Sequence, residues 1–358
     1  MKLDHYTEEA VRLLCALIET PSLSREEEAT AQLLVEELAA MGLPAHRIGN
    51  NVVSAQPGGE DKPVVVLNSH HDTVRPNVDW TLRPFRATVD GDRISGLGSN
   101  DAGGCLVSLL QAYRHYYPQD LPFRLVFIAS AEEEVSGAGG LRHALEVLAL
   151  QPELAIVGEP TQTNLAISEK GLLVLDGMAT GKSGHAAHQY GDNAITAALE
   201  DIQRLHRFAF PKTSKLLGPV KLTVTQIDAG TQHNVVPDEC RFVVDCRVNE
   251  HYSNDEVLAT LRDLCTSRLK PRSTHLNSSR IDPIHPIVLR GLALGKTTYG
   301  SPTLSDQVFF DCPSVKVGPG DSTRSHQADE YILRSEIRMG VETYIDLLDG
   351  LTLSSALG

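Results

Sequence analysis

The chain has 358 residues, with 32 basic and 46 acidic side chains and a formal net charge of −14. Its length exceeds the roughly 250–300 residues at which single hydrophobic cores stop growing, so we expect two domains. Because no apolar run approaches the ~18–20 residues that cross a bilayer, and no basic block could neutralise phosphates, we expect neither a membrane span nor a nucleic-acid partner.

The cysteines and the N-terminal segment both favour a reducing compartment. None of the six cysteines forms a C-x-x-C pair, which argues against a disulfide framework and against zinc-finger spacing. The segment MKLDHYTEEAVRLL carries acidic residues where a signal peptide has its basic and apolar regions. We therefore expect a cytoplasmic protein in which any metal site is built from the 14 histidines and the carboxylates.

Two helices are predicted at the start of the chain. The first has Thr7 as its N-cap, apolar residues at helical spacing, and Pro21 beyond its end. Ser24 and Glu27 form a capping-box pattern for the second helix, which Gly42 ends.

Three short, continuous apolar runs follow, at residues 64–67, 125–129 and 154–157. Strands that are buried on both faces of a parallel sheet have this character. Periodicity alone does not distinguish such runs from buried helix. Since the intervening segments are long enough for helical crossovers, we expect an α/β fold, with a mostly parallel central sheet flanked by helices.

Between residues 168 and 280 the apolar pattern changes to alternation. Residues 221–228 and 240–249 are predicted to form strands with one solvated face, and a last strand is expected near 274–280. Asn193 and a Ser253-x-x-Glu256 capping box begin two helices.

The resulting order is that of a ferredoxin-like α+β domain: strand, helix, two strands, helix and strand. We expect residues 168–280 to be inserted as a lid or dimerisation domain into a catalytic domain of residues 1–167 and 281–358.

Histidine and acidic residues follow directly on each of the three apolar runs. The first run leads to His70 and Asp72, the second to Glu133 and Glu134, and the third to Glu159. In an open α/β sheet, ligands bind at the carboxyl ends of the strands. Imidazole and carboxylate ligands suit Zn²⁺ or Co²⁺. The sequence therefore predicts a metal centre at this edge of the sheet.

Two glycine-containing motifs are only superficially like nucleotide-binding loops. The Gly96–Gly104 segment has Asp101 where the third glycine of G-x-G-x-x-G would stand, and Asp101 alone could equally be a helix cap. Gly181-Lys-Ser183 has Asp176 in place of the first glycine of a phosphate loop. We discard both nucleotide-binding interpretations.

Together these motifs resemble the dinuclear zinc amidohydrolases of the acetylornithine deacetylase, succinyl-diaminopimelate desuccinylase and aminoacylase group, which are of the M20 type. Each motif alone is weak, but seven occur in the family's order over nearly the whole chain. They are His70-His71-Asp72, Gly96 to Asp101, the acidic triplet before Gly137, Gly158-Glu-Pro160, Gly184-His185-Ala186-Ala187, Asn234-Val-Val-Pro237 and Ser325-His326.

The resemblance implies that five side chains hold two Zn²⁺ or Co²⁺ ions per chain. His70 and Glu159 would bind one ion, Glu134 and His326 the other, and Asp101 would bridge them. It also implies a cis peptide bond after Asp101. Because His326 must return to the first domain, the second domain would be an insertion.

The resemblance also assigns catalytic roles. Glu133 would be the general base that takes a proton from water and passes it to the leaving amine. Asp72 would fix the tautomer of His70 by accepting its other N–H. The acidic triplet alone would be read as a solvated helix N-terminus.

Three residues of the inserted domain would contact the substrate. His185 would stabilise the oxyanion, in cis or in trans, while Asn234 and Arg247 would hold the substrate, the latter as a bidentate fork on a carboxylate. Without the resemblance, they would be read as an exposed turn histidine, a turn asparagine and a surface arginine.

The implied reaction is hydrolysis of the amide bond of an N-acyl amino acid, namely N-acetyl- or N-succinyl-ornithine or N-acetylcitrulline, in arginine biosynthesis and within a homodimer. The Ser301–Gln307 segment departs from the glycine-rich pattern of many members, which leaves the acyl group open. The alternatives are a dipeptidase or aminopeptidase, a succinyl-diaminopimelate or acetyl-lysine deacylase, and a non-catalytic binding protein.

Overall fold

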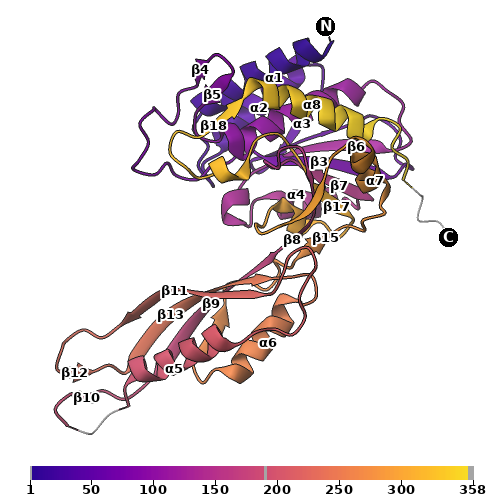
Figure 1. The fold of residues 1–358 in the computed structure, drawn as a ribbon. Helices are drawn as coiled ribbons and strands as arrows, with labels where there is room; N and C mark the ends of the chain where they lie inside the picture. Colours follow the sequence, from indigo (N-terminus) through magenta and orange to yellow (C-terminus); the bar gives the residue numbers. More distant parts are fainter. Residues whose placement is uncertain (1, 189–191, 354–358) are drawn as a thin grey trace. The chain divides into compact units, whose positions relative to one another are not determined.

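The computed structural model describes residues 2–188 and 192–353. The chain forms two compact units, which are considered separately (Figure 1). The first comprises Met1–Ile167, Ile281–Tyr299 and Ser305–Gly358, and the second comprises Ser168–Arg280 and Gly300–Leu304. In the sequence, Ser168–Arg280 therefore interrupts the first unit, and Gly300–Leu304 interrupts it a second time.

The first unit is built on a mixed sheet whose centre is parallel. Strand β3 pairs in parallel with β6 and β7, and β7 pairs in parallel with β17, whereas β1, β2 and β8 pair antiparallel at the edges. The order is β1 (His46–Ile48), β2 (Asn51–Ala55), β6 (Arg124–Ser130), β3 (Val64–His70), β7 (Leu154–Val157), β17 (Ser314–Lys316), β8 (Leu165–Glu169) and β15 (Ser279–Arg280), with β16 (Thr298–Ser301) also on β8.

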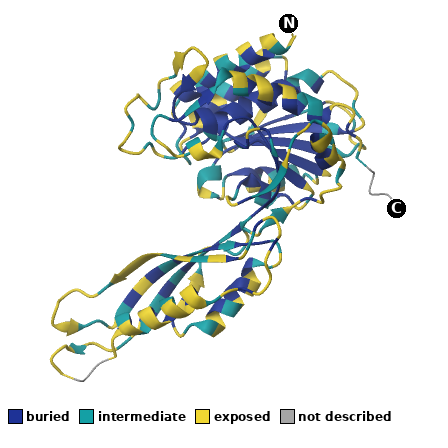
Figure 2. Cartoon of the chain, viewed as in Figure 1, coloured by how far each residue is buried: buried dark blue, intermediate teal, exposed yellow. Residues whose placement is uncertain are grey.

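Both faces of this sheet are buried, which explains the continuous apolar runs. Val65 and Leu67 of β3 belong to one hydrophobic cluster and Val66 to another. Figure 2 shows the central strands buried between helices. These helices are α1 (Lys2–Glu19), α2 (Glu28–Ala40), α3 (Gly104–Tyr116), α4 (Leu141–Leu148), α7 (Pro286–Ala293) and α8 (Arg334–Leu348). The predicted α/β fold is confirmed.

The predicted starts of the first two helices are wrong. Helix α1 begins at Lys2, and the Thr7 hydroxyl donates to the Leu3 carbonyl inside it instead of capping it. Ser24 is not the cap of α2, because its hydroxyl donates to the Asp72 carboxylate at 2.7 Å. A distant partner therefore overrides the local capping pattern.

The second unit has the predicted order of elements and an antiparallel sheet. Helices α5 (Ala194–Arg207) and α6 (Asn254–Leu264) cover one face of the sheet (Figure 1). The strands run in the order β11 (Lys221–Ala229), β13 (Glu239–Val248), β9 (Gly171–Thr180) and β14 (Arg268–Pro271). A small two-stranded antiparallel sheet is formed by β10 (Gly184–His185) and β12 (Val235–Val236), which are far apart in the sequence.

The position of the last strand was predicted incorrectly. The strand that completes this sheet is Arg268–Pro271, whereas within the predicted 274–280 only Ser279–Arg280 is strand, and it pairs with β8. Leu269 is the only buried residue of β14, since the strand lies at an edge. One apolar residue gives no alternation to detect.

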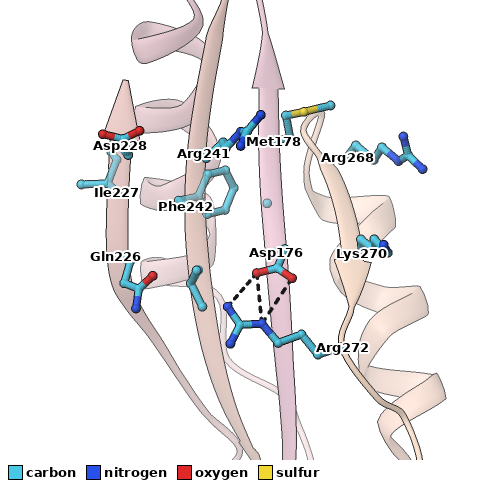
Figure 3. A pocket seen from close by; sticks show the side chains of 12 residues that line it. Asp176, Met178, Gln226, Ile227, Asp228, Arg241, Phe242, Arg268, Lys270 and Arg272 are labelled. Carbon is cyan, nitrogen blue, oxygen red and sulfur yellow. Dashed lines mark hydrogen bonds and ion pairs between the residues drawn. The ribbon is translucent and has the colours of Figure 1, made fainter. Parts of the chain in front are cut away.

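The other face of this sheet is open and carries a cleft of about 760 Å³. Figure 3 shows Arg272 reaching across to Asp176, with a shortest N–O distance of 2.9 Å. Met178, Arg241 and Lys270 also line the cleft. The charged residues on this face of the sheet account for the alternating pattern of β13.

No helix in the described part of the chain is long and apolar enough to span a bilayer.

Candidate metal centre

His70 is the last residue of the central strand β3, and its ring is buried. Its Nε2 atom lies 3.2 Å from Oδ1 of Asp101 and 3.7 Å from Oε1 of Glu159, which follows β7. The adjacent parallel strands β3 and β7 therefore bring their C-terminal residues to one place. This is the edge of the sheet at which the sequence predicts the metal centre.

Asp101 lies between two histidines. It belongs to a short irregular helix, η1 (Ser99–Gly103), and the Asp101–Ala102 peptide bond is cis. Its Oδ1 atom faces His70, while its Oδ2 atom lies 3.7 Å from Nε2 of His326. A single carboxylate thus presents one oxygen to each side of the cluster.

The second side of the cluster is formed by Glu134 and His326. Glu134 lies in a 3₁₀ turn, η2 (Glu133–Val135), that follows β6. Its two carboxylate oxygens lie 2.9 and 3.2 Å from Nε2 of His326. The His326 side chain is about half exposed, at 54%.

The structure therefore brings together all five predicted ligand residues. Within the described residues, two groups of side chains have ligand atoms that all lie within 4.8 Å of one another. The groups are His70, Glu133 and Glu159, and His70, Asp101 and Glu134. Glu133, the predicted base, thus lies beside the predicted ligands.

Asp72 is buried behind these side chains and contacts more of them than the sequence predicts. The shorter contact of His70 Nδ1 is with the main-chain oxygen of Asp72, at 3.0 Å, whereas Oδ1 of Asp72 lies 3.4 Å away. The carboxylate instead accepts the main-chain N–H groups of Glu133 (3.0 Å) and Glu134 (3.2 Å). Asp72 therefore anchors the η2 turn as well as the His70 ring.

The three glutamates of the acidic triplet have different surroundings. Glu132 has a positive φ of 55°, and its carboxylate accepts the N–H of Gly139 at 3.3 Å. Its side chain fills the space where a Cβ on Gly137 would lie. Glu132 thus shapes the turn, while Glu133 and Glu134 belong to the cluster.

His185 and Asn234 lie together in the second unit. His185 is exposed in the two-stranded sheet of β10 and β12, and its Nδ1 accepts the N–H of Ala187 at 3.1 Å. The N–H of Ala186 donates to the main-chain oxygen of Asn234 at 2.9 Å. These two predicted substrate-contacting residues therefore share one surface.

Arg247 lies at the opposite end of β13 from Asn234. Its Nε and Nη2 atoms donate to the two carboxylate oxygens of Asp245, at 2.9 and 3.1 Å. The bidentate fork that the family resemblance implies for a substrate carboxylate is thus formed with a neighbouring residue of the same strand.

Comparison with known proteins places the chain in a family. A model of the peptidase dimerisation domain matches residues 167–273, and a model of peptidase family M28 matches residues 51–207. The acetylornithine deacetylase of Yersinia pseudotuberculosis is 28% identical over 90% of this chain and 92% of its own length. A dinuclear metal-binding M20 peptidase of Bacillus subtilis superposes with a TM-score of 0.73 over 97% of this chain and 100% of that chain, at 16% identity.

The chain belongs to the M20 peptidase family. A probable carboxypeptidase of Ajellomyces capsulatus is also similar, at 26% identity over 94% of this chain and 84% of its own length. The chain is therefore an M20 hydrolase, related to both deacetylases and peptidases. The likeness to the Bacillus subtilis structure shows a shared fold.

Burial and crowding raise the pKa values of three carboxyl groups of this M20 hydrolase. Desolvation is the largest cause in each case, and the negative charges of neighbouring carboxylates add to it. The pKa of Glu159 rises to about 8, and those of Glu133 and Glu134 also lie above their usual range. Divalent cations relieve such repulsion. The imidazole and carboxylate donors present therefore fit two ions of the zinc type.

Two buried carboxylates near this centre were not assigned roles from the sequence. Oδ2 of Asp306 accepts the hydroxyl of Ser130 at 2.5 Å, and burial is the main cause that raises the Asp306 pKa to about 7. Glu330 accepts main-chain N–H groups of the loop that carries Asp101. In the sequence, the feature that points to a role for Glu330 is its position four residues after the predicted ligand His326.

Proposed function

We propose that this M20 hydrolase is a metal-dependent N-acyl-amino-acid deacylase. Its substrate would be N-acetyl- or N-succinyl-ornithine or N-acetylcitrulline, and it would act in arginine biosynthesis in the cytoplasm. The observation that carries the proposal is the Asp101 carboxylate between two histidine-containing groups, with Glu133 beside them. The likeness to an acetylornithine deacetylase over 90% of the chain supports this substrate class.

Two Zn²⁺ or Co²⁺ ions would be held by the five predicted ligands. His70 and Glu159 would hold one, Glu134 and His326 the other, and Asp101 would face both. When bound, such ions polarise a carbonyl group and acidify water.

Glu133 would carry the proton in this reaction. Its main-chain N–H is fixed by Asp72, while its side chain lies among the ligand residues. The carboxylate would take a proton from the water whose oxygen attacks the amide carbon. It would return that proton to the nitrogen as the C–N bond breaks, releasing the free amino acid and a carboxylate.

His185 would stabilise the oxyanion that develops on the amide oxygen. Because Nδ1 accepts the Ala187 N–H, the neutral ring carries its proton on Nε2, which is then available as a donor. Asn234 would hold the substrate beside it. Arg247 would bind a substrate carboxylate only by sharing its guanidinium with Asp245.

The second unit would also form the contact of a homodimer. The match to the peptidase dimerisation domain over residues 167–273 supports this assignment. In such a dimer, His185 could serve the centre of its own chain or that of the partner.

A peptidase is the second candidate function. The likeness to a probable carboxypeptidase over 94% of the chain favours it. Both activities hydrolyse an amide bond, so the proposed roles of Glu133 and the metal ligands would be unchanged. Only the groups that contact the acyl or aminoacyl side of the substrate would differ.

A panel of substrates tests the proposal. The zinc-loaded protein would be assayed with N-acetyl- and N-succinyl-ornithine, N-acetylcitrulline, N-acetyl-lysine, succinyl-diaminopimelate and dipeptides, with a chelated sample as the control. We expect metal-dependent hydrolysis of an acylated ornithine or of N-acetylcitrulline. Hydrolysis of dipeptides alone would replace the deacylase proposal with the peptidase one.

A further inference from the structure

Glu330 forms an unusual group of contacts with the loop that carries Asp101. Its side chain is almost completely buried, at 2% exposed, and it lies just before strand β18 (Tyr331–Leu333). Its carboxylate accepts three main-chain N–H groups, from Gly98 at 3.1 Å, Asn100 at 2.8 Å and Asp101 at 2.9 Å. Its own main-chain oxygen accepts the N–H of Gly96 at 3.0 Å. One residue thus holds four amides of this loop.

These amides need a partner that the loop itself does not provide. Gly98 has a φ of 73°, and a Cβ there would lie 2.5 Å from the methyl group of Thr73, so the loop is tightly folded against its surroundings. A buried N–H group without a partner is costly. Several convergent N–H groups form a site for an anion. The side chain of Glu330 supplies the acceptor oxygens for these groups from within the chain.

A second set of contacts ties the same loop to the segment that carries His326. The side-chain oxygen of Asn100 accepts the N–H of Asp321 at 3.0 Å, and its amide nitrogen donates to the Asp321 main-chain oxygen at 3.0 Å. That nitrogen also lies 3.4 Å from the hydroxyl of Ser325. The loop that carries Asp101 is thus joined to the chain before His326 by Asn100, and to the chain after His326 by Glu330.

We propose that Glu330 is a positioning residue for the metal centre. By fixing the main chain at Asn100 and Asp101, it sets where the two Asp101 oxygens lie between His70 and His326. Both oxygens of Glu330 accept main-chain N–H groups, so it acts through Asp101 and not as a ligand itself. The inference rests on the proposed function, because it takes Asp101 to be a metal ligand.

The substitution Glu330→Gln tests this role with little change in size. An amide has one oxygen and one NH₂ group, so at least one of the loop N–H groups would then face a donor. We expect zinc affinity to fall by about 10–100-fold, the range found when residues behind metal ligands are changed. Competition with a chromophoric chelator on the full-length protein measures this directly.

The substitution Asp201→Asn in the second unit is a matched control. Asp201 is also a buried carboxylate that accepts main-chain N–H groups, from Thr266 and Ser267. Its replacement should lower thermal stability and leave zinc affinity unchanged. Wild-type zinc affinity in Glu330→Gln, or an equal loss of affinity in both variants, would overturn the inference.

Two further results separate this inference from the proposed function. A wild-type protein that binds fewer than one zinc ion in the same titration would refute the metal centre, and the positioning role with it. Hydrogen exchange of the metal-free wild type covers the case in which Glu330→Gln does not fold. We expect slow exchange at Gly98, Asn100 and Asp101, and rapid exchange there would overturn the role of Glu330.

Discussion

Replacing Asp72 with asparagine should weaken zinc binding and the stability of the metal-free protein together. The Asp72 carboxylate accepts the N–H groups of Glu133 at 3.0 Å and Glu134 at 3.2 Å, and also the hydroxyl of Ser24 at 2.7 Å. Asparagine offers one oxygen and one NH₂ group. One of the two N–H groups would therefore lose its acceptor, and the other would keep a neutral one.

The magnitude follows from these two bonds. An orphaned buried N–H costs about 1–3 kcal/mol, and exchanging a charged acceptor for a neutral one costs about 1 kcal/mol more. We therefore expect the free energy of unfolding of the metal-free protein to fall by about 2–4 kcal/mol. Because the η2 turn carries Glu134, zinc affinity should also fall, by about 10–100-fold.

Urea unfolding of the metal-free protein and chelator competition measure the two effects. The substitution Ser24→Ala is the matched control, because it removes one bond to Asp72 and leaves both N–H groups with their acceptor. It should change zinc affinity by less than about fivefold, which is the equivalent of the roughly 1 kcal/mol that a typical net hydrogen bond is worth. Zinc affinity of Asp72→Asn within twofold of the wild type would refute the anchoring role.

Two further predictions concern pH and the dimer. The metal-free protein should become less stable as the pH rises from about 4.5 to about 9, because folding raises the pKa of Glu159 to about 8 and that of His326 to about 9. As the pH rises, the unfolded chain therefore releases these protons before the folded protein does, which favours unfolding. A free energy of unfolding, measured with urea, that rises over this pH range would contradict these raised pKa values. If His185 acts in trans, a mixed dimer of His185→Ala and Glu133→Gln chains should regain activity at one site. No recovery would indicate a role in cis.

The parallel sheet could be predicted because both of its faces are covered. Val65, Val66 and Leu67 are all buried, so the run is continuous, and the residues that follow such runs lie at one edge of the sheet. That reasoning located His70 and Glu159 without any knowledge of tertiary contacts. Strand β14 escaped detection because an edge strand with one buried residue has no pattern.

The contacts that hold the centre together could not be read from the sequence. Ser24 has the spacing of a helix cap, yet its partner is Asp72, 48 residues away in the chain. Glu330 and Asp306 are ordinary acidic residues until the fold buries them beside other parts of the chain. Residue type, spacing and family resemblance predict candidate metal ligands, whereas the residues that orient them are defined by tertiary packing.

The central claim is that Glu133 is the base at a two-metal centre. Measuring metal content and turnover of Glu133→Gln beside the wild type, on whichever substrate of the panel is hydrolysed, tests it most directly. We predict two ions per chain in both proteins and a loss of turnover of at least about 10²–10⁴-fold in the variant, as for removal of a general base. A Glu133→Gln protein that holds its metal and keeps wild-type turnover would contradict the account.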